Sequence, residues 1–308
     1  MTQASAPGKI ILFGEHAVVY GRPALAVPVM QVHADVDVSD AARPGIWIDA
    51  PDVNLHAELN TLPSDHPIAS VIHNFLFLSR ASPFPNLEIR ITSTIPVASG
   101  LGSGAAVTVA LTRALASHLS YSMTDEEINA FAYEIEKLHH GTPSGIDNTV
   151  VTYARPVYFV KGELIETFKV GAPFTILIAD TGISAPTKES VGDVRRLWLN
   201  DRSRWETVFD KIGEVAFTAR RAIESGKWEL LGELMNENHE LLQKLTVSSP
   251  ELDRLVEAAC NAGALGAKMS GGGRGGNMIA LVNAEIAEKV SLALKEAGAR
   301  NIIRTQIS

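Results

Sequence analysis

The sequence predicts an α+β protein built from two domains. Its 308 residues are about twice the length of a typical domain. Hydrophobic residues make up 46% of the chain and charged residues 20%, a balance that allows a large buried core and excludes a disordered protein. Segments with strand and helix patterns follow one another irregularly, without the regular β-α-β alternation of a parallel α/β fold.

The domain boundary is predicted from breaks in these patterns, because the chain has no internal repeat, low-complexity tract or linker. Gly162 and the segment Gly171-Ala172-Pro173 interrupt the periodic segments around them. We therefore expect an N-terminal domain over residues 1–168 and a C-terminal domain over residues 169–308.

The first half of the chain contains two strand patterns and two helix patterns. Apolar and polar residues alternate over 32–38 and again over 87–92, which predicts two half-buried strands. Between them, apolar residues at 68–76 recur with helical spacing. A helix of small residues is expected over about 105–119, directly after a cluster of glycines.

The next helix has a well-defined start. Thr124 can cap it and Glu127 completes a capping box. The turn residues of segment 141–148 are expected to end this helix. Its predicted core stripe consists of Ile128, Phe131, Ala132, Ile135 and Leu138.

The second half of the chain is predicted to be mostly helical around a few strands. Ser249 and Pro250 supply a cap and a first-turn proline for one helix. The expected strands lie at 174–179, 278–282 and around 302–303, and the expected long helical region covers 203–247, with a break near 225–226.

Charge and cysteine content exclude several classes of protein. A formal net charge of −8 argues against a dedicated nucleic-acid-binding protein, which normally presents a basic field. The single cysteine, Cys260, excludes an internal disulfide framework and fits a reducing compartment. No apolar run reaches the length of a membrane helix, and Glu15 and His16 break the apolar N-terminal run too early for a signal peptide. We expect a cytoplasmic protein.

The first glycine cluster, Pro96–Ala106, lies between a predicted strand and a predicted helix. Glycines allow backbone N–H groups to face an anion, and a helix N-terminus adds a partial positive charge. The cluster does not match the P-loop pattern, which occurs nowhere in the chain. Local pattern alone leaves two interpretations open, a phosphate site or a flexible loop before a core helix.

The second glycine cluster, Ser270–Gly276, contains a literal G-x-G-x-x-G sequence. The dinucleotide-binding motif requires a helix after these glycines, whereas the residues that follow predict a strand, so we reject that interpretation. A loop that packs closely on a ligand and a plain hairpin turn both stay open. The entropic cost of so many glycines favours the first.

Several charged residues are candidates for chemistry without being decisive alone. Lys9 follows Pro7-Gly8 at the expected entry of the first strand, and Asp147 falls in the predicted turn. Glu134 and Glu136 lie at opposite edges of the apolar stripe of their helix, and periodicity does not choose between them.

Taken together, these segments resemble the galactokinase–homoserine kinase–mevalonate kinase–phosphomevalonate kinase superfamily. Three motifs occur in the order and at the spacing of that superfamily and span nearly the whole chain. The first motif, over residues 6–21 with Gly14-Glu15-His16 at its centre, is most similar to the mevalonate kinase branch. Segments 238–242 and 249–253 are similar to the C-terminal half of archaeal and bacterial members of that branch.

The resemblance implies a two-domain α+β kinase fold with its active site in the cleft between the domains. It implies transfer of the γ-phosphoryl group of ATP to the 5-hydroxyl of (R)-mevalonate, with Mg2+ as cofactor, in isoprenoid precursor synthesis. ATP and mevalonate are then the expected partners. Nucleic acid and membrane are not expected, and a homodimer is possible within the family.

The resemblance also assigns roles by position. Asp147 matches the catalytic aspartate, which would accept the proton of the substrate hydroxyl, and Lys9 matches the lysine that would stabilise the developing negative charge. Glu136 matches the glutamate that ligates Mg2+. The residues that match the triphosphate-binding loop are Pro96, Ser99, Gly100, Leu101, Gly102, Ser103, Gly104, Ala105 and Ala106. The residues that match the substrate-binding set are Glu15, His16, Thr187, Gly271 and Gly272.

The chain departs from the family pattern at three places. Gly104 stands where the loop usually has a second serine; a serine of this pair ligates Mg2+ in relatives, so Ser103 or a water is expected to take that place. Arg274 stands where a glycine is usual, and two roles are open for it, contact with an ATP phosphate or exposure to solvent. Ala154-Arg155 replaces a usual pair of glycines, and either Arg155 or Lys161 could meet the mevalonate carboxylate.

Two other functions are consistent with the residues. One is a kinase for a different small alcohol, such as a sugar or phosphomevalonate. The other is a non-catalytic ligand sensor, which the loss of the second loop serine would favour. The joint presence of Lys9, Glu136 and Asp147 argues against a sensor, because a sensor has no need of a general base.

Overall fold

The computed structural model describes residues 1–308 except 97–99, 141–142, 165 and 185–186. The chain folds into two compact units. Unit 1 contains residues 1–9, 29–97 and 101–154, and unit 2 contains residues 10–28, 98–100 and 155–308.

This division differs from the single boundary at residue 168 that the sequence suggested. The reason lies in two long strands, β1 (Thr2–Phe13) and β2 (Ala24–Asp40), each of which carries residues of both units. A strand that leaves one unit and enters the other gives no break in hydrophobic pattern, so composition alone does not reveal it.

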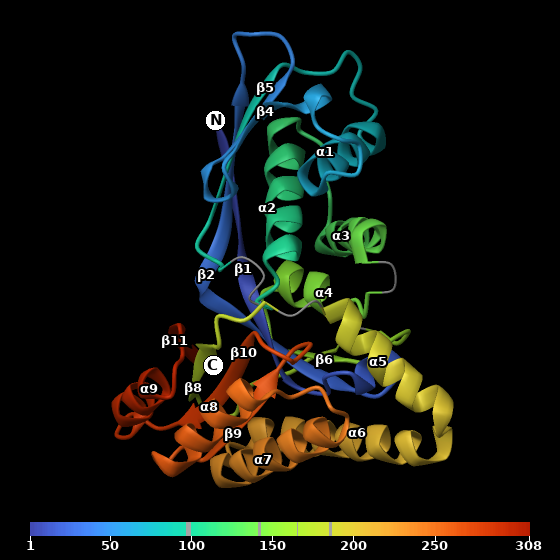
Figure 1. The fold of residues 1–308 in the computed structure, drawn as a ribbon. Helices are drawn as coiled ribbons and strands as arrows, with labels where there is room; N and C mark the ends of the chain where they lie inside the picture. The colour runs from blue at the N-terminus through green and yellow to red at the C-terminus, as the bar shows by residue number, and fades with distance from the viewer. Residues whose placement is uncertain (97–99, 141–142, 165, 185–186) are drawn as a thin grey trace. The chain divides into compact units, whose positions relative to one another are not determined.

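Unit 1 is a β-sheet with helices packed on it (Figure 1). Within the unit, strands β4, β3, β5 and β2 are neighbours in that order, and β1 pairs with β2. The predicted alternation is confirmed in β2, where Val32, Val36 and Val38 are buried. The remaining elements of the unit are β3 (Ile46–Ala50), β4 (Leu55–Glu58), α1 (Pro67–Leu78), β5 (Leu87–Ser93), α2 (Ser103–His118), α3 (Asp125–His140) and α4 (Ile146–Tyr153), with short 3-10 turns at 51–53 and 59–61.

Helix α2 is the central helix of unit 1. It contacts β5 and also α1, α3 and α4, so nearly its whole circumference is buried. Small residues make this possible: Ala106, Ala110 and Ala114 are each 0% exposed and let the neighbouring backbones approach closely. The tight packing fixes the N-terminal end of α2, at the first glycine cluster.

The capping box predicted for α3 is present. The Thr124 backbone N–H donates to Glu127 Oε2 at 2.8 Å, and the Glu127 N–H donates to Thr124 Oγ1 at 3.2 Å. Leu138, which the predicted core stripe included, is 64% exposed. On a helical wheel it lies roughly 80° from Ile128, at the margin of the buried face, so the prediction was wrong at this position.

Unit 2 is built around an antiparallel four-stranded sheet with the order β11-β8-β10-β9. Helices α7, α8 and α9 pack against this sheet, and α6 packs against α5 and α7 (Figure 1). A smaller pairing joins Ala24–Ala26 of β2 to β6, and β6 to β7. The elements are a 3-10 turn (Ala17–Tyr20), β6 (Val157–Phe159), β7 (Glu166–Thr167), β8 (Phe174–Asp180), α5 (Thr187–Asn200), α6 (Arg202–Ser225), α7 (Trp228–Lys244), α8 (Pro250–Asn261), β9 (Gly266–Ser270), β10 (Asn277–Val282), α9 (Ala287–Glu296) and β11 (Asn301–Ile307).

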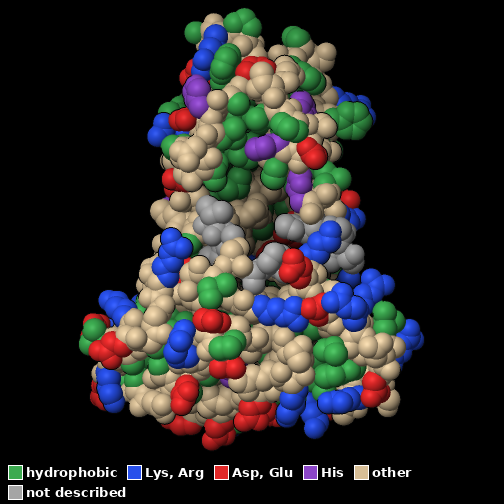
Figure 2. Space-filling model, viewed as in Figure 1, with side chains coloured by type: hydrophobic (Ala, Val, Ile, Leu, Met, Phe, Trp, Pro, Cys, Tyr) green, Lys and Arg blue, Asp and Glu red, His purple; other side chains and the backbone are tan. Residues whose placement is uncertain are grey.

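Helix α7 has an exposed acidic face and a buried face. Glu229, Glu233, Glu237 and Glu240 are all exposed, whereas Asn238 and His239 are buried. Figure 2 shows acidic side chains gathered along the edge of unit 2 at which Figure 1 places α7. This face accounts for part of the net charge of −8 and would repel a nucleic-acid backbone.

Two helices were not expected from the sequence. Helix α4 begins at Ile146, inside the segment predicted to be a turn, and α5 covers a segment for which no element was predicted. Among the described residues, no helix is both long and apolar enough to span a membrane.

Candidate functional site

In unit 1, strand β1 brings Lys9 to the N-terminal end of helix α4. The Lys9 Nζ lies 2.9 Å from Asp147 Oδ1. The Lys9 side chain is 5% exposed, whereas that of Asp147 is 33% exposed. The Lys9 ammonium is therefore buried and held in place, whereas the Asp147 carboxylate stays partly accessible to solvent. Lys9 lies inside β1 rather than at its entry, which is why it is so well buried.

Asp147 belongs to the first turn of α4 rather than to a turn that ends α3. Gly145 caps the helix with φ of 89°, a left-handed conformation that favours glycine. A carboxylate in the first turn of a helix is stabilised by the unpaired backbone N–H groups there. The local backbone thus holds the Asp147 carboxyl group beside Lys9.

The end of the first glycine cluster packs against the same lysine. The Lys9 N–H donates to the Leu101 carbonyl at 2.9 Å. A Cβ placed on Gly102 would lie 2.8 Å from Lys9 Cγ, and the φ of Gly102 is 75°, so only glycine fits here. Because α2 begins at Ser103, its N-terminal N–H groups begin immediately beside the Lys9 side chain.

The residues predicted to bind the triphosphate divide into three groups. Ser99 lies outside the described residues. Leu101, Ala105 and Ala106 are buried, so only their backbone atoms can face a ligand. The positions that are not buried are Pro96, Gly100, Ser103 and Gly104, together with Gly102.

The structure distinguishes between the two glutamates on α3. Glu134 is exposed and pairs with Lys137 at 2.6 Å. Burial and the nearby Asp147 carboxylate raise the pKa of Glu136 to about 8, an effect that Lys9 partly offsets. Glu136 is therefore the glutamate that shares the electrostatic environment of Lys9 and Asp147, and its role as a Mg2+ ligand stays a prediction.

This raised pKa predicts a dependence of stability on pH. The pKa of Glu136 is about 8 in the folded protein against a reference value of 4.5, so the folded state binds the proton more tightly. Its stabilising contribution is complete below about pH 4.5 and is lost as the pH rises through about 8, by at most about 1.4 kcal/mol per pH unit. We expect Glu136→Gln to flatten the fall of the thermal unfolding midpoint between pH 5 and 8. Glu134→Gln, on the exposed side of the same helix, is the matched control, and an equal effect of both variants would contradict the prediction.

In unit 2, the residues Gly14-Glu15-His16 form a sharp turn after β1. Gly14 has φ of 91°, and a Cβ there would lie 2.3 Å from the Pro23 carbonyl oxygen. The His16 Nε2 donates to the Gly272 carbonyl at 3.1 Å, and because a carbonyl only accepts, Nε2 carries the proton. Burial and the nearby Arg274 guanidinium lower the pKa of His16 to about 4, so the ring is neutral at pH 7. Its Nδ1 is buried with no hydrogen-bond partner among the described residues.

Glu15 is closed off from solvent in unit 2. Its side chain and that of Lys268 are each 0% exposed and form an ion pair. Both carboxylate oxygens of Glu15 already accept hydrogen bonds from protein groups. Glu15 can therefore affect substrate binding only through its neighbours in this turn.

The second glycine cluster is a tight loop that packs on the start of α5. A Cβ on Gly272 would lie 2.8 Å from Thr187 Oγ1, the first residue of α5. Gly271 has φ of 86° and open space around its Cβ position, so backbone conformation rather than crowding favours glycine there. The predicted substrate residues Thr187, Gly271, Gly272 and His16 therefore lie together in unit 2.

Arg274 is half-buried rather than fully exposed to solvent, and its contact with an ATP phosphate stays a prediction. Its guanidinium pairs with Asp193 on α5, and its Nε lies 3.4 Å from the Thr246 carbonyl. Hydrogen bonding from Arg274 lowers the pKa of Asp193 below its usual value. Where the family usually has glycine, this chain keeps a left-handed backbone, with φ of 60°, and adds a side-chain link to α5.

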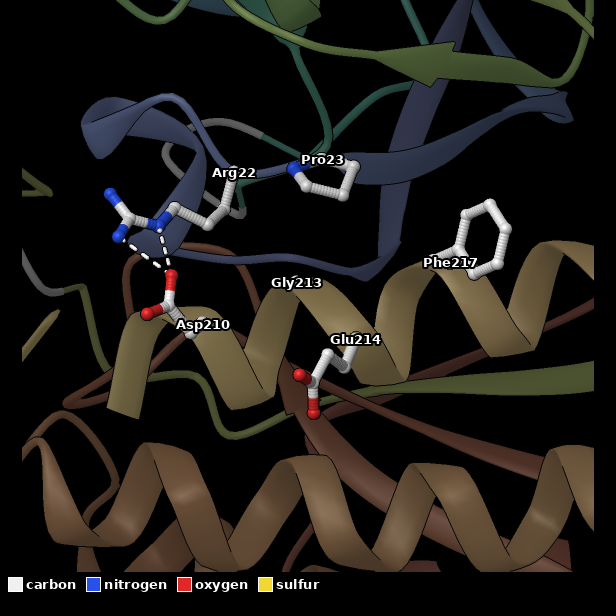
Figure 3. Close-up of a pocket in the computed structure, with 6 residues that line it drawn as sticks. All are labelled: Arg22, Pro23, Asp210, Gly213, Glu214 and Phe217. Carbon is white, nitrogen blue, oxygen red and sulfur yellow. Dashed lines mark hydrogen bonds and ion pairs between the residues drawn. The ribbon is translucent and has the colours of Figure 1, made fainter. Parts of the chain in front are cut away.

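A surface groove in unit 2 shares no lining residue with the predicted site. Figure 3 shows it between Pro23 and helix α6, with Phe217 on one side and the Arg22–Asp210 pair on the other. The Arg22 guanidinium is occupied, since its Nε and Nη2 donate to Asp210 Oδ1 at 3.0 and 2.7 Å. The described residues that line the groove therefore offer no free cation for a phosphate.

Comparison with known proteins identifies the family of this chain. The model of the GHMP kinase N-terminal domain matches residues 68–155, which include α2, Glu136 and Asp147, and the model of the C-terminal domain matches residues 219–300. A mevalonate kinase of Pyrococcus abyssi is 38% identical, covering 99% of this chain and 95% of the relative. The chain belongs to the GHMP kinase family. A mevalonate kinase of Thermococcus sibiricus is 36% identical to this GHMP kinase, covering 99% and 96% of the two chains.

Solved structures show the same fold. This GHMP kinase matches a crystal structure of L. major mevalonate kinase in complex with R-mevalonate at a TM-score of 0.87 and 28% identity, covering 100% of this chain and 96% of the other. It matches the mevalonate kinase of Methanococcus jannaschii at a TM-score of 0.84 and 27% identity, covering 99% and 96%. A galactokinase of Lactococcus lactis, at 20% identity, shares the fold with a TM-score of 0.79, covering 99% and 92%. The predicted α+β kinase fold is confirmed.

Lys268 and Asp193 are partners of site residues that were not predicted from the sequence. A signal for Lys268 was available: a lysine in the middle of a short apolar strand is rarely buried unless it is paired. Asp193 gave no such signal, since an acidic residue on a polar helix is ordinary.

Proposed function

We propose that this GHMP kinase transfers the γ-phosphoryl group of ATP to the 5-hydroxyl of (R)-mevalonate, in isoprenoid precursor synthesis. The curated relatives that cover nearly its whole length are named mevalonate kinases. The observation that carries the chemistry is the Lys9–Asp147 pair, at 2.9 Å, beside the N-terminal end of α2. A kinase needs a base for the alcohol, a cation for the developing charge and donors for phosphate, and unit 1 supplies all three.

In this mechanism Asp147 accepts the proton of the 5-hydroxyl as its oxygen attacks the γ-phosphorus. The new O–P bond forms while the bond between the γ-phosphorus and the bridging β,γ-oxygen breaks, and ADP leaves with the electron pair. Lys9 donates a hydrogen bond to Asp147 and places one positive charge next to the attacking oxygen. Such phosphoryl transfers depend mostly on positioning and charge neutralisation.

The proposed triphosphate site is the backbone of the first glycine cluster. The N-terminal N–H groups of α2 provide donors and a partial positive charge without a lysine of the P-loop type. Gly100, Gly102 and Ser103 would let the phosphates approach the backbone, and Pro96, Ser99 and Gly104 complete the proposed loop.

The residues of unit 1 also fit Mg2+. The described residues hold no group of three or more His, Cys, Asp or Glu side chains that could bind a metal, which matches an ion that usually takes one or two carboxylates plus substrate phosphates. Glu136 fits best, because its carboxylate is crowded by Asp147 and would gain from a second cation. Glu136 and Ser103 are the proposed ligands. When bound, Mg2+ supplies charge neutralisation on the phosphates of ATP.

Unit 2 supplies the proposed substrate-binding residues. His16 is proposed to border the substrate with a neutral ring, whose Nε2 is held by the Gly272 carbonyl. Thr187 contributes an exposed hydroxyl, and the backbone of Gly271 and Gly272 completes the set. Glu15 is proposed to act through His16. A cytoplasmic location and a homodimer stay predictions.

A substrate panel tests the proposed function. ADP release, coupled to an optical assay, is measured at initial rate with racemic mevalonate, galactose, homoserine and phosphomevalonate. We expect turnover with mevalonate at least about 100-fold above the others in kcat/KM. Faster turnover of another alcohol would contradict mevalonate as the substrate. Nucleotide binding without turnover of any alcohol would indicate a sensor instead of a kinase.

Gly104 gives a prediction about the metal. It is the second residue of α2, its φ is not positive, and no atom lies within 4 Å of a Cβ placed on it, so a side chain fits. We expect Gly104→Ser and Gly104→Ala each to stabilise the protein by about 0.5–1 kcal/mol, because glycine is entropically unfavourable in a helix. Only Gly104→Ser restores the serine that is usual in the family. It should therefore lower the Mg2+ concentration for half-maximal rate several-fold, and an equal decrease in the alanine variant would contradict a role as ligand.

A further inference from the structure

Two segments far apart in the sequence are joined in unit 2, and both carry proposed substrate-binding residues. The first is the end of β1 with the turn that follows it, and the second is β9 with the second glycine cluster. Ser270 Oγ donates to the Ile11 carbonyl at 2.7 Å, and His16 Nε2 donates to the Gly272 carbonyl at 3.1 Å. These two hydrogen bonds are neutral.

The third link between the segments is charged and fully buried. Lys268 Nζ donates to Glu15 Oε1 and to the Met269 carbonyl, the latter at 2.6 Å. Asn238 Nδ2, from α7, donates to the other carboxylate oxygen of Glu15 at 3.2 Å. Both charged side chains are 0% exposed, so neither is in contact with solvent or available to a ligand.

A buried ion pair is a poor way to stabilise a fold. The cost of removing two charges from water often exceeds their attraction, and an apolar pair of the same size is frequently as stable. An ion pair has a defined distance and direction between its charged atoms, which an apolar contact lacks. The Lys268–Glu15 pair is therefore better explained by a role in positioning the two segments than by a role in stability.

The turn that contains Glu15 has an unfavourable backbone conformation, so other contacts must stabilise it. Gly14 and His16, on either side of Glu15, have φ of 91° and 61°, and a left-handed backbone at a residue with a Cβ is unfavourable. Such a conformation persists only where surrounding contacts hold it in place. The contacts of the Glu15 side chain with Lys268 of β9 and Asn238 of α7 hold this turn.

We propose that Lys268 is a positioning residue, whose buried ion pair with Glu15 holds His16 and the Gly271-Gly272 loop in register for substrate binding. This inference rests on the proposed function of these residues as the substrate-binding set. Lys268 touches no substrate, and it acts through Glu15 and the turn.

The test compares three variants, Glu15→Gln, Lys268→Met and the double variant that carries both changes. Each single change leaves one buried charge unpaired, so we expect it to lower the unfolding midpoint by more than about 5 °C. The double variant leaves no charge, and we expect its midpoint to return to within about 3 °C of the starting protein. The KM for mevalonate of the double variant should nevertheless rise about ten-fold, with kcat changed less than about three-fold.

Two outcomes would overturn the proposal. If the double variant regains both its stability and the original KM, the pair serves the fold alone. If the double variant fails to fold, the pair is a folding requirement and the positioning role is likewise wrong. The control removes another ion pair of the same unit, Arg220 Nη1 to Glu166 Oε2 at 2.7 Å, as Arg220→Met/Glu166→Gln. We expect that variant to keep its KM.

A second measurement separates this inference from the proposed function. The pKa of His16, followed by the NMR shift of its ring protons, should rise from about 4 toward 6.5 in the double variant as the turn loosens and the ring becomes hydrated. This shift needs no substrate. Absence of turnover in the starting protein would refute the kinase proposal alone, and an unchanged pKa of His16 would refute the positioning role alone.

Discussion

Replacing Asp147 by asparagine is expected to lower kcat by about 10³-fold while the protein stays folded, because general base catalysis typically contributes about 10²–10⁴-fold. The asparagine amide has the shape of the carboxylate and still accepts a hydrogen bond from Lys9, but it takes up no proton. Asp147 is 33% exposed, so the change costs little packing. ADP release with saturating mevalonate measures the effect.

A matched control distinguishes catalysis from the loss of any helix-start carboxylate. Asp125 lies in the first turn of α3, pairs with Arg113 Nη2 at 2.7 Å and belongs to the same unit. Asp125→Asn removes a comparable ion pair and should leave kcat unchanged. Equal activity of Asp147→Asn and the starting protein would refute the proposed base.

Much of the fold could be predicted because several elements carry their defining signal within one short segment. The alternation in β2 and the capping box of α3 each contain enough local information to define a strand or a helix start. Helix α4 escaped detection because it has only eight residues and carries adjacent β-branched residues, Val150 and Val151, which are also typical of strands. Helix α5 escaped because only Ser190 and Val194 are buried on its described part, so it has almost no apolar stripe.

The candidate site was predictable in composition but not in contacts. Local pattern alone does not identify Lys9 and Asp147 as functional, and only the resemblance to a family assigns them roles in one site. Their ion pair joins β1 to α4, two elements far apart in the sequence, so no short window of sequence contains it. The same holds for Glu15, whose occupied carboxylate follows from Lys268 at the other end of the chain.

Lys9→Met is expected to lower kcat by about 10²–10³-fold, because it removes the ammonium beside the proposed attacking oxygen. Methionine has nearly the length of lysine and can occupy the same buried position against Gly102, so the loss should be electrostatic. Lys137→Met is the control, since Lys137 is an exposed lysine of α3 that pairs with Glu134 and lies over the Tyr133 ring. We expect it to keep full activity.

Lys9→Met and Asp147→Asn together test the geometry of the site independently of turnover. Asp147 raises the pKa of Glu136 and Lys9 lowers it. Asp147→Asn should therefore move that pKa below about 8, whereas Lys9→Met should move it above about 8, as measured from carboxyl carbon shifts in metal-free protein. Two substitutions in one ion pair would thus shift a third residue in opposite directions. This result requires Glu136 to lie within electrostatic reach of both partners, and a shift in the same direction for both variants would show that the three groups do not form one site.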